Sequence, residues 1–286
     1  MKPTSGQEIN FTVGGRERYL SDYVNSHLRE MQLALLDILF EIDRICRRHD
    51  IQYWLDSGTL LGAVRHGGFI PWDDDIDICM PREQISRFIA IASRELPPHL
   101  FVQTAQTEGL EGVLLCKVRN LNSFYVEPAD DFSRHYCKGL YVDIFPMEPW
   151  PSLPYKFSKT LARGYGRANA ILNAKHYYTL RSAAELPYFT CKRALFGCIW
   201  RVSKLLCGNR KYYSNVINNS GNGFRHMRET IFPLSTITFE GKEFFAPSDP
   251  DRYLRDLLGS GYMQLPPPEQ RQNHALFFAT SLSDLK

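Results

Sequence analysis

The feature that most constrains this chain is an acidic run in which two aspartates alternate with isoleucines. Residues 71–78 read PWDDDIDI, so one apolar residue separates Asp75 from Asp77. Successive side chains of a β-strand point to opposite faces. The alternation therefore predicts a strand with both carboxylates on one face and Ile76 and Ile78 in the core. Two such carboxylates can share a divalent cation, because Mg²⁺ prefers carboxylate and phosphate oxygens.

A turn of small residues upstream is suited to a phosphate. Ser57-Gly58-Thr59 follows an alternating apolar segment, residues 51–55, that predicts a strand. Gly58 allows a phosphate to approach the backbone closely, and a helix beginning near Thr59 would present free N–H groups to it. Arg65 and His66 stand at the far end of that helix, before a Gly-Gly pair that ends it. The pattern predicts a phosphate cradle followed by a metal site.

Asp143 is a third candidate carboxylate. It lies between Val142 and Ile144 in an apolar run, where a charge is costly unless something pairs with it. A cation shared with Asp75 and Asp77 would pair with it, and so would a buried arginine. The residues alone leave both options open.

Each of the neighbouring charged residues has more than one interpretation. Lys117 and Arg119 alternate onto one face of a predicted strand, where they would contact phosphates or simply be solvated. Asp73 and Asp74 would belong to the site, to a solvated loop or to a structural Ca²⁺ site. The EF-hand pattern fails, because Ile78 stands where glycine is required, and glutamate is also missing from its position.

The central string resembles a known family. LDSGTLLGAVRHGGFIPWDDDIDI, residues 55–78, is similar to the LicD-type phosphocholine transferases, which have a nucleotidyltransferase fold and are related to the fukutin-related proteins. The resemblance continues in patches over roughly residues 30–275, at 117–119, at 141–146, and from Tyr262 through Arg271 and His274. Residues 258–263 read LGSGYM and depart from the family pattern expected at this position. The departure affects the predicted acceptor side more than the predicted metal site.

The resemblance implies a specific reaction. A sugar hydroxyl of a glycan precursor would attack the phosphorus of a CDP-linked alcohol, with CDP-choline as the default donor, and expel CMP. Mg²⁺ or Mn²⁺ would bind Asp75, Asp77 and Asp143, and Asp143 or Asp73 would take the acceptor proton. The residues implied in binding donor phosphates are Ser57, Gly58, Thr59, Arg65, His66, Lys117 and Arg119.

The sequence indicates less clearly which residues would bind the acceptor and the choline group. Trp72, Arg271 and His274 are candidates for the acceptor side, and His274 is equally suited to a capping or core role. Trp72 and Tyr53 are candidates for a cation–π contact with choline. Core packing explains either aromatic residue as well.

The periodicities predict an α+β fold. We expect a nucleotidyltransferase-like mixed β-sheet core flanked by helices, with a basic helical insertion or subdomain. The predicted helices cover residues 28–48, 82–96 and much of 155–207, and a hairpin turns at Glu240-Gly241. The expected organisation is a poorly ordered lead-in at 1–24, a catalytic core at 25–150, the basic helical subdomain at 151–225 and a C-terminal segment at 226–286.

The middle of the chain is strongly basic. Residues 149–228 contain fourteen Lys and Arg but one acid, Glu185. Such a segment would bind an anionic acceptor, an anionic membrane or nucleic acid. Of these three partners, we do not expect nucleic acid. The helix around residues 191–207 would rest on a membrane surface or pack as part of a helical subdomain.

The remaining features concern location. No apolar run is long enough for a membrane span and the N-terminus lacks an apolar signal core, so we expect a cytoplasmic protein, with the inner face of a membrane as a possible site of action. The seven cysteines are scattered without a Cys-x-x-Cys pair, which disfavours disulfides and a zinc ribbon.

Three functional interpretations remain from the sequence. The first is the metal-dependent phospho-alcohol transferase. The second is a nucleotidyltransferase that moves NMP to an acceptor. The third is a non-catalytic protein that binds membranes or glycans through its basic helices.

Overall fold

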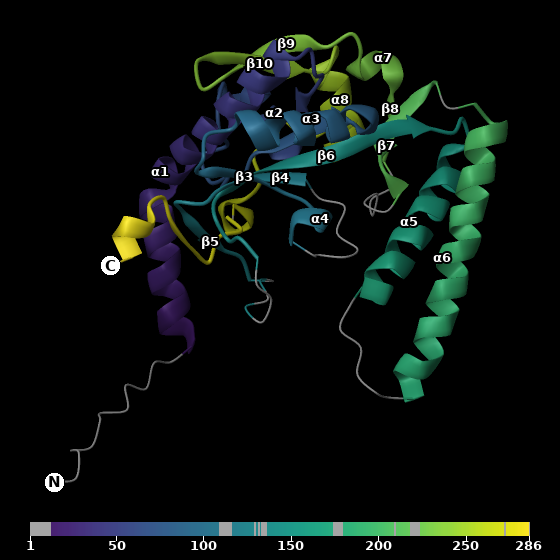
Figure 1. The fold of residues 1–286 in the computed structure, drawn as a ribbon, viewed down its shortest axis with the longest axis horizontal. Coiled ribbons are helices and arrows are strands. Elements are labelled where there is room, and N and C mark those ends of the chain that lie inside the picture. Colours follow the sequence, from purple (N-terminus) through teal and green to yellow (C-terminus); the bar gives the residue numbers. More distant parts are fainter. Residues whose placement is uncertain are drawn as a thin grey trace.

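A seven-stranded mixed sheet organises the fold (Figure 1). The computed structural model describes residues 13–108, 116–128, 130, 132, 136–173, 180–208, 210–217, 224–271 and 273–285. The sheet has the order β1-β2-β6-β4-β3, and β7 and β8 extend it from the distal half of β6. Its strands are β1 (Trp54–Leu55), β2 (Asp77–Pro81), β3 (Leu100–Gln103), β4 (Cys116–Asn120), β6 (Tyr141–Trp150), β7 (Tyr212–Asn215) and β8 (His226–Met227).

The long strand β6 is the centre of this sheet. Its first half pairs in parallel with β2 and antiparallel with β4, and its last residues pair antiparallel with β7. The β2–β6 pair is the parallel one among the described strands. A mixed sheet with flanking helices confirms the predicted α+β class. β7 lies within residues 151–225, the predicted basic helical subdomain, and pairs with β6.

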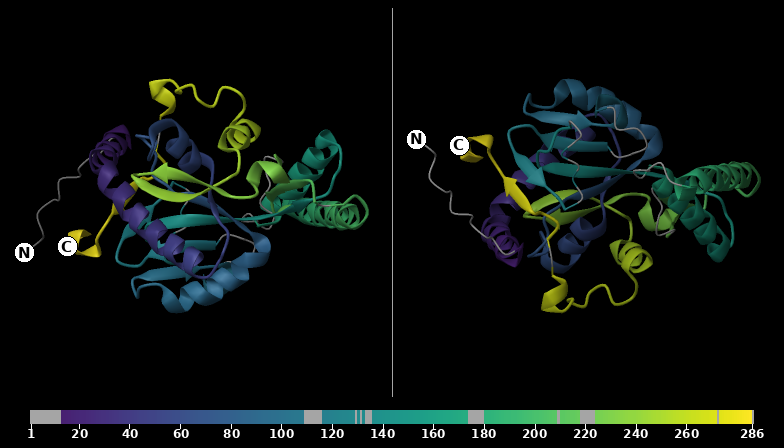
Figure 2. Two further views of the ribbon diagram at one scale, coloured as in Figure 1. Left: turned by 90° about the horizontal axis from the view of Figure 1, so that it is seen from above. Right: turned by 90° about the horizontal axis from the view of Figure 1, so that it is seen from below.

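Two helices cover one face of the sheet. α1 (Val13–Arg48) and α3 (Arg82–Glu95) both contact β6 and lie across the strands in the view from above (Figure 2). The predicted apolar residues of α1 are buried: Leu28, Met31, Leu35, Ile38, Leu39, Ile42, Ile45 and Cys46. α1 begins fifteen residues before the predicted start at Leu28, and Val24 is fully buried. The expected boundary between residues 24 and 25 thus falls inside α1, where Val24 continues the apolar face of the helix.

The remaining elements surround the β1–β2 edge and the chain ends. They are α2 (Ser57–His66), α4 (Ala105–Glu108), β5 (Phe124–Val126), α7 (Arg228–Ile231), the hairpin β9 (Ser235–Phe239) and β10 (Lys242–Ala246), α8 (Pro250–Leu258), β11 (Phe277–Ala279), and two short 3₁₀ turns at Pro268–Gln270 and Leu282–Leu285. The predicted hairpin is confirmed, with Glu240 and Gly241 both at positive φ. Asp249 caps α8 by accepting the backbone N–H of Arg252.

Two antiparallel helices protrude from one end of the sheet (Figure 1). α5 (Tyr155–Asn173) and α6 (Leu180–Leu206) connect β6 to β7 and pack on each other around a small core of Trp150, Leu161, Ala162 and Trp200. A Cβ atom at Gly164 would lie about 2.0 Å from the Phe196 ring, so glycine is what allows the two helices to approach here. Within the described residues, no helix combines the length and apolarity that a bilayer crossing requires.

One ion pair ties the hairpin to α1. Both oxygens of Glu240 accept from Arg29, at 3.0 and 2.6 Å, and Oε1 also accepts the backbone N–H of Phe69. The hydrogen bonds from Arg29 lower the pKa of Glu240. A lowered carboxyl pKa means that stabilisation is present above the unfolded-state pKa and is lost as the pH falls through the folded-state pKa.

We therefore expect Glu240→Gln to lower the free energy of unfolding by about 1–2 kcal/mol near neutral pH, an effect limited by the exposure of Arg29. The difference from the unmodified protein should shrink below about pH 4. Denaturant unfolding at several pH values measures it, with the exposed Glu229→Gln as control. An equal difference at pH 7 and pH 3.5 would contradict the role of the ion pair.

Candidate active site

Four aspartates gather where β2 and β6 begin; we call Asp73, Asp75, Asp77 and Asp143 the acidic cluster. Asp77 opens β2 and is the register partner of Asp143 in β6. Register partners in neighbouring strands point to the same face, about 4.8 Å apart along the hydrogen-bonding direction. The parallel pairing of β2 with β6 thus places two carboxylates side by side that are far apart in sequence.

The structure corrects the predicted position of Asp75. β2 starts at Asp77, so Asp75 lies in the preceding loop and not on the same strand face. β1 pairs only with Ile78 and Cys79, which leaves the segment before Asp77 without an antiparallel partner. Asp75 still joins the cluster electrostatically, because its charge raises the pKa of Asp77.

Burial and mutual repulsion raise the pKa values throughout the cluster. Burial, then Asp75 and Asp74, raise the pKa of Asp73 to about 8. Burial, then Asp74, raise the pKa of Asp75 to about 6, with Asp143 adding to the effect. The pKa of Asp77 lies well above its usual range for the same reasons. The cluster therefore holds its negative charge at a cost in free energy, which a cation would relieve.

Lys117 supplies one positive charge. Its ammonium lies 2.9 Å from Oδ1 and 3.0 Å from Oδ2 of Asp143, its register partner across β4 and β6. Burial nevertheless raises the pKa of Asp143 against the opposing effect of Lys117. Both side chains are almost buried, at 12% and 14% exposed. Lys117 thus lies among the carboxylates and is not the solvated residue that one sequence interpretation allowed.

The chemistry of the cluster fits Mg²⁺ or Mn²⁺ better than a softer metal. Its side chains offer only carboxylate oxygens, which are the ligands of hard cations. Asp75 is 27% exposed, so the cluster can be reached from solvent. As the side chains lie, no three His, Cys, Asp or Glu residues in the described ranges form a ready ion cage. A cation would have to draw these carboxylates together, and a substrate phosphate would complete its ligands.

The predicted phosphate cradle lies directly against the acidic cluster. A Cβ atom at Gly58 would come within 2.7 Å of an Asp73 oxygen, so glycine is required for this approach. Ser57 has a positive φ of 46°, and its hydroxyl donates to Asp56. The hydroxyl of Thr59 accepts the backbone N–H of Asp77 and thereby fixes α2 to β2. The start of α2 and the start of β2 therefore form one surface.

The other predicted phosphate ligands differ in their availability. Arg65 donates to the backbone carbonyl groups of Tyr262 and Gln264, while His66 accepts from Arg65. Arg119 is 7% exposed and donates to Gln103 and to the carbonyl group of Gly139. Arg119 therefore serves as a buried structural residue in this structure, and Lys117 is the basic residue of β4 that reaches the cluster.

Asp74 joins the acidic loop to the C-terminal segment. This carboxylate is 2% exposed and accepts the backbone N–H groups of His274 and Ala275, at 2.8 and 2.6 Å, and the hydroxyl of Tyr125. The ring of His274 lies 3.1 Å from Asp74, and its hydrogen bond to Asp74 raises the pKa of His274 to about 9. Asp74 is therefore not the solvated residue that one sequence interpretation allowed.

The aromatic candidates for a choline contact have separate environments. Tyr53 is fully buried, donates to Asp43 and packs edge-on against Phe245, so it belongs to the core. Trp72 is partly buried, and the guanidinium of Arg271 lies 4.9 Å from its ring centroid. The ring of Trp72 therefore already makes a cation–π contact with Arg271.

A buried group beside Asp77 escaped the sequence analysis. Asp56, 3% exposed, accepts a hydrogen bond of 2.7 Å from the hydroxyl of Tyr253 in α8, and the Trp54 indole donates to the same hydroxyl. Its charge contributes to the raised pKa of Asp77. Asp56 directly precedes Ser57 in the sequence, but nothing local indicates a partner almost two hundred residues away.

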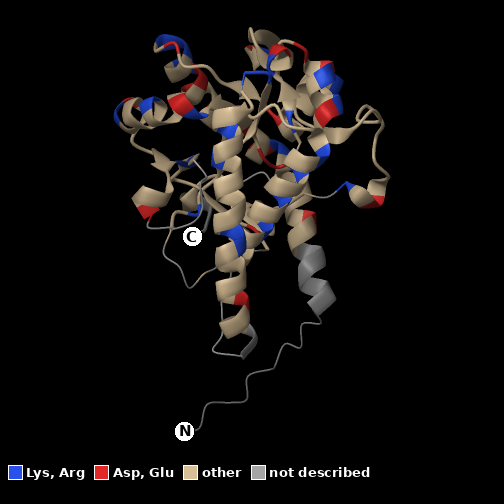
Figure 3. Ribbon diagram, turned by 90° about the vertical axis from the view of Figure 1, so that its right-hand side faces the viewer, with Lys and Arg blue, Asp and Glu red and all other residues tan. Residues whose placement is uncertain are grey.

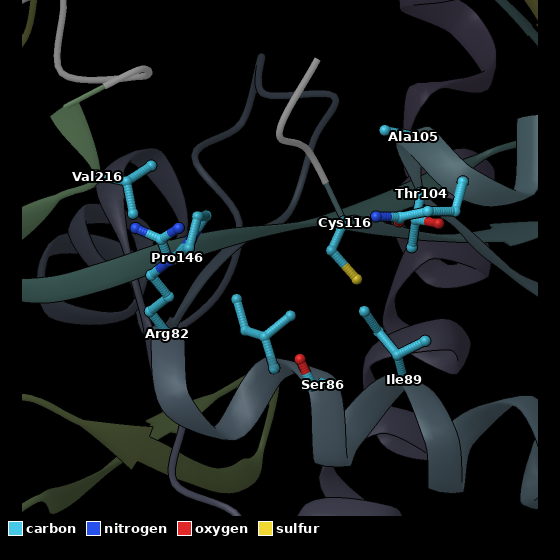
Figure 4. A pocket seen from close by; sticks show the side chains of 10 residues that line it. Arg82, Ser86, Ile89, Thr104, Ala105, Cys116, Pro146 and Val216 are labelled. Carbon is cyan, nitrogen blue, oxygen red and sulfur yellow. The ribbon is translucent and has the colours of Figure 1, made fainter. Parts of the chain in front are cut away.

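A separate pocket lies on the other face of the sheet (Figure 4). It has a volume of about 320 Å³ and lies between α3 and the strands, with Arg82, Ser86, Ile89 and Cys116 among its lining residues. Cys116 adjoins Lys117 in β4, so its side chain points away from the acidic cluster. This pocket is distinct from the candidate active site.

Known proteins share both the central motif and most of the chain. Residues 50–162 match the family model described as the LicD/FKTN/FKRP nucleotidyltransferase domain. The lipopolysaccharide cholinephosphotransferase LicD of Haemophilus influenzae is 28% identical over 270 residues, which cover 86% of this chain and 95% of that protein. The human ribitol 5-phosphate transferase FKRP is 51% identical over 104 residues, or 35% of this chain and 17% of that protein. An uncharacterized protein of Rickettsia prowazekii is 31% identical over about half of each chain.

The raised pKa of Asp73 predicts how stability changes with pH in metal-free buffer. A folded-state pKa of about 8 means that the native protein binds a proton more tightly than the unfolded chain, whose aspartates titrate near 3.9. The stabilisation is therefore complete below about pH 4 and is lost as the pH rises towards 8. Asp73→Asn should reduce this loss in denaturant titrations with EDTA. Equal pH slopes for Asp73→Asn and for the exposed control Asp37→Asn would contradict the assignment.

The Asp74 contacts predict a structural effect. Asp74→Ala leaves buried N–H and O–H donors without an acceptor, and we expect it to lower the free energy of unfolding by roughly 2–4 kcal/mol. Hydrogen exchange should accelerate at residues 274–279 before other segments. Exchange of that segment unchanged from the native rate would show that other contacts hold it, and Asp37→Ala serves as the control.

Proposed function

Because this chain belongs to the LicD family, we propose that it transfers a phospho-alcohol group from a CDP-linked donor to a sugar hydroxyl of a glycan precursor. The observation that carries the proposal is the register pairing of Asp77 with Asp143 beside the Gly58 turn. This arrangement positions carboxylates, a lysine and helix N–H groups around one site. Phosphoryl transfer requires such groups to position the phosphate and to stabilise its charge. Two relatives are described as a cholinephosphotransferase and a ribitol 5-phosphate transferase, which supports a phospho-alcohol as the transferred group.

Asp75, Asp77 and Asp143 are the residues that would hold Mg²⁺ or Mn²⁺. When bound, the metal would neutralise charge on the donor phosphates and on the departing CMP. The raised pKa values of these aspartates favour such a role, because repulsion between them is what a divalent cation would remove.

Residues around the cluster would orient the donor. The N-terminal turn of α2 offers backbone N–H groups to phosphate oxygens. The Lys117 ammonium, a compact charge on a flexible side chain, would contact a phosphate once Asp143 has another cation partner. Arg65 stands at the far end of α2, where the charge of Asp73 acts on it, and would add a further contact.

The reaction then balances as a single displacement. The acceptor hydroxyl oxygen forms a bond to the phosphorus next to the alcohol, the bond from that phosphorus to the bridging oxygen breaks, and CMP departs. Of the two candidate bases, Asp143 is paired with Lys117, whereas Asp73 lies at the phosphate cradle. We assign the acceptor proton to Asp73 on this geometry.

The donor alcohol is choline by this proposal. The LicD relative is matched along 86% of this chain and FKRP along 35%, so similarity favours phosphocholine. Trp72 is the candidate aromatic residue for this contact, and a choline on its ring would have to replace Arg271. The acceptor would be a lipid-linked glycan, modified in the cytoplasm at the inner face of a membrane.

A donor panel tests the chemistry first. Ligands that bind the native state raise its melting temperature by mass action. We expect a metal-dependent rise with CDP-choline that is larger than with CDP-ribitol, CDP-glycerol or CTP. A rise with nucleoside triphosphates alone would favour nucleotidyl transfer, and no rise with any of them would favour a binding protein.

Substitutions then test the residues. Asp77→Asn and Asp143→Asn should each lower the rate of CMP release by about two orders of magnitude or more, because each removes a ligand for the catalytic metal. The melting temperature of Asp77→Asn should stay equal to or above that of the unmodified protein, since this change relieves repulsion in the cluster. Asp143→Asn should lower the melting temperature, because the almost buried Lys117 loses its charge partner. Asp37→Asn is the matched exposed control. Wild-type rates in either variant would refute the metal assignment.

A further inference from the structure

Helix α6 carries an apolar stripe on its outer side. Its members recur at alternating intervals of four and three residues, and all are exposed: Ala184, Tyr188, Cys191, Leu195, Cys198, Val202 and Leu205. Leu195, Val202 and Leu205 are 58%, 51% and 83% exposed. Of the sixteen exposed large hydrophobic residues in the described part of the chain, six belong to this one helix. The stripe spans about 32 Å at 1.5 Å per residue.

The inner side of α6 is already occupied. Trp200 packs edge-on against Trp150, and Phe196 joins the same small core with α5. Residues 196 and 200 lie on the side of the helix opposite to the stripe at 3.6 residues per turn. The stripe is therefore additional to the face that holds the two helices together, and folding of the hairpin does not account for it.

Basic side chains flank the stripe. Lys192 lies along one edge and Arg201 along the other, each roughly 90° from the centre of the stripe at 3.6 residues per turn. Arg193 and Lys204 lie on the inner side, where Arg193 donates to Asn169 of α5 and Lys204 pairs with Glu148 at 2.8 Å. The two helices together contain nine Lys and Arg and a single acid, Glu185. Figure 3, in which α6 faces the viewer, shows a mainly uncharged ribbon interrupted by basic positions. An apolar stripe between basic edges is the pattern of a helix that lies in a membrane interface.

A second copy of the chain is the competing occupant. Alternating spacings of three and four residues also suit a coiled coil, in which charged residues beside the apolar seam pair with opposite charges. Here Lys192 and Arg201 border the seam, both are positive, and no acid is near them on α6. Two copies would bring like charges together, whereas an anionic surface complements them.

We propose that the outer face of α6 docks the protein on an anionic lipid bilayer, with Tyr188, Leu195, Val202 and Leu205 entering the interface and the flanking Lys and Arg contacting lipid headgroups. The helix lies along the surface, with its inner face still packed on α5. This docking does not depend on the proposed reaction, since it uses residues outside the candidate active site.

Vesicle flotation tests the docking. We expect the full chain to float with phosphatidylcholine vesicles that contain roughly one-third phosphatidylglycerol, and to be released as salt screens the headgroup charge. Leu195→Asn with Val202→Asn should weaken partitioning roughly tenfold or more, because the apolar stripe can no longer enter the interface. Arg201→Gln should weaken binding to the anionic vesicles and reduce its salt dependence.

The controls make every outcome decisive. Leu33→Asn with Leu121→Asn removes two exposed leucines elsewhere and should float normally, while circular dichroism melting confirms that all variants fold. Flotation with pure phosphatidylcholine equal to that with anionic vesicles, or flotation unaffected by the stripe variant, would overturn the proposal. So would absence of flotation together with a dimer in light scattering that the stripe variant converts to a monomer.

Discussion

The parallel pairing of β2 with β6 is the constraint on which the candidate active site depends. It is the one parallel contact among the described strands of the sheet, and its register sets Asp77 opposite Asp143. The antiparallel β4 then brings Lys117 to the other side of Asp143. Three charged side chains from three strands are thus positioned by backbone hydrogen bonds, which is more rigid support than loops would give.

This arrangement costs free energy, because it concentrates negative charge in a largely buried site. Burial raises the pKa of every member of the acidic cluster and repulsion adds to it, while the nearby positive charges of His274 and Lys117 offset only part of the effect. Sites that bind phosphate and metal commonly keep such unfavourable charge, because ligand binding recovers the free energy that folding alone does not. The same property makes the cluster a sensitive point for pH, for metal and for substitution.

The sequence predicted the parts of the fold that have a local cause. Apolar periodicity predicted α1 and α3, and Gly241 predicted the turn at Glu240-Gly241. The alternation of Asp75 with Asp77 was misleading, because strand length depends on a partner, and β1 is only two residues long. The Asp56–Tyr253 and Asp74–His274 contacts join residues about two hundred positions apart, a separation that no local pattern encodes. The domain boundaries remain predictions.

The contact between Asp74 and residues 274–275 also has a consequence for the order of events during synthesis. A chain emerging from the ribosome would have formed α1, β2 and β6 long before these residues appear, since domains generally fold from the N-terminus as they are made. Until then, Asp74 would lie beside Asp73 and Asp75 without the N–H donors that neutralise it. The acidic loop therefore reaches its final form only after residues 274 and 275 have been added to the chain.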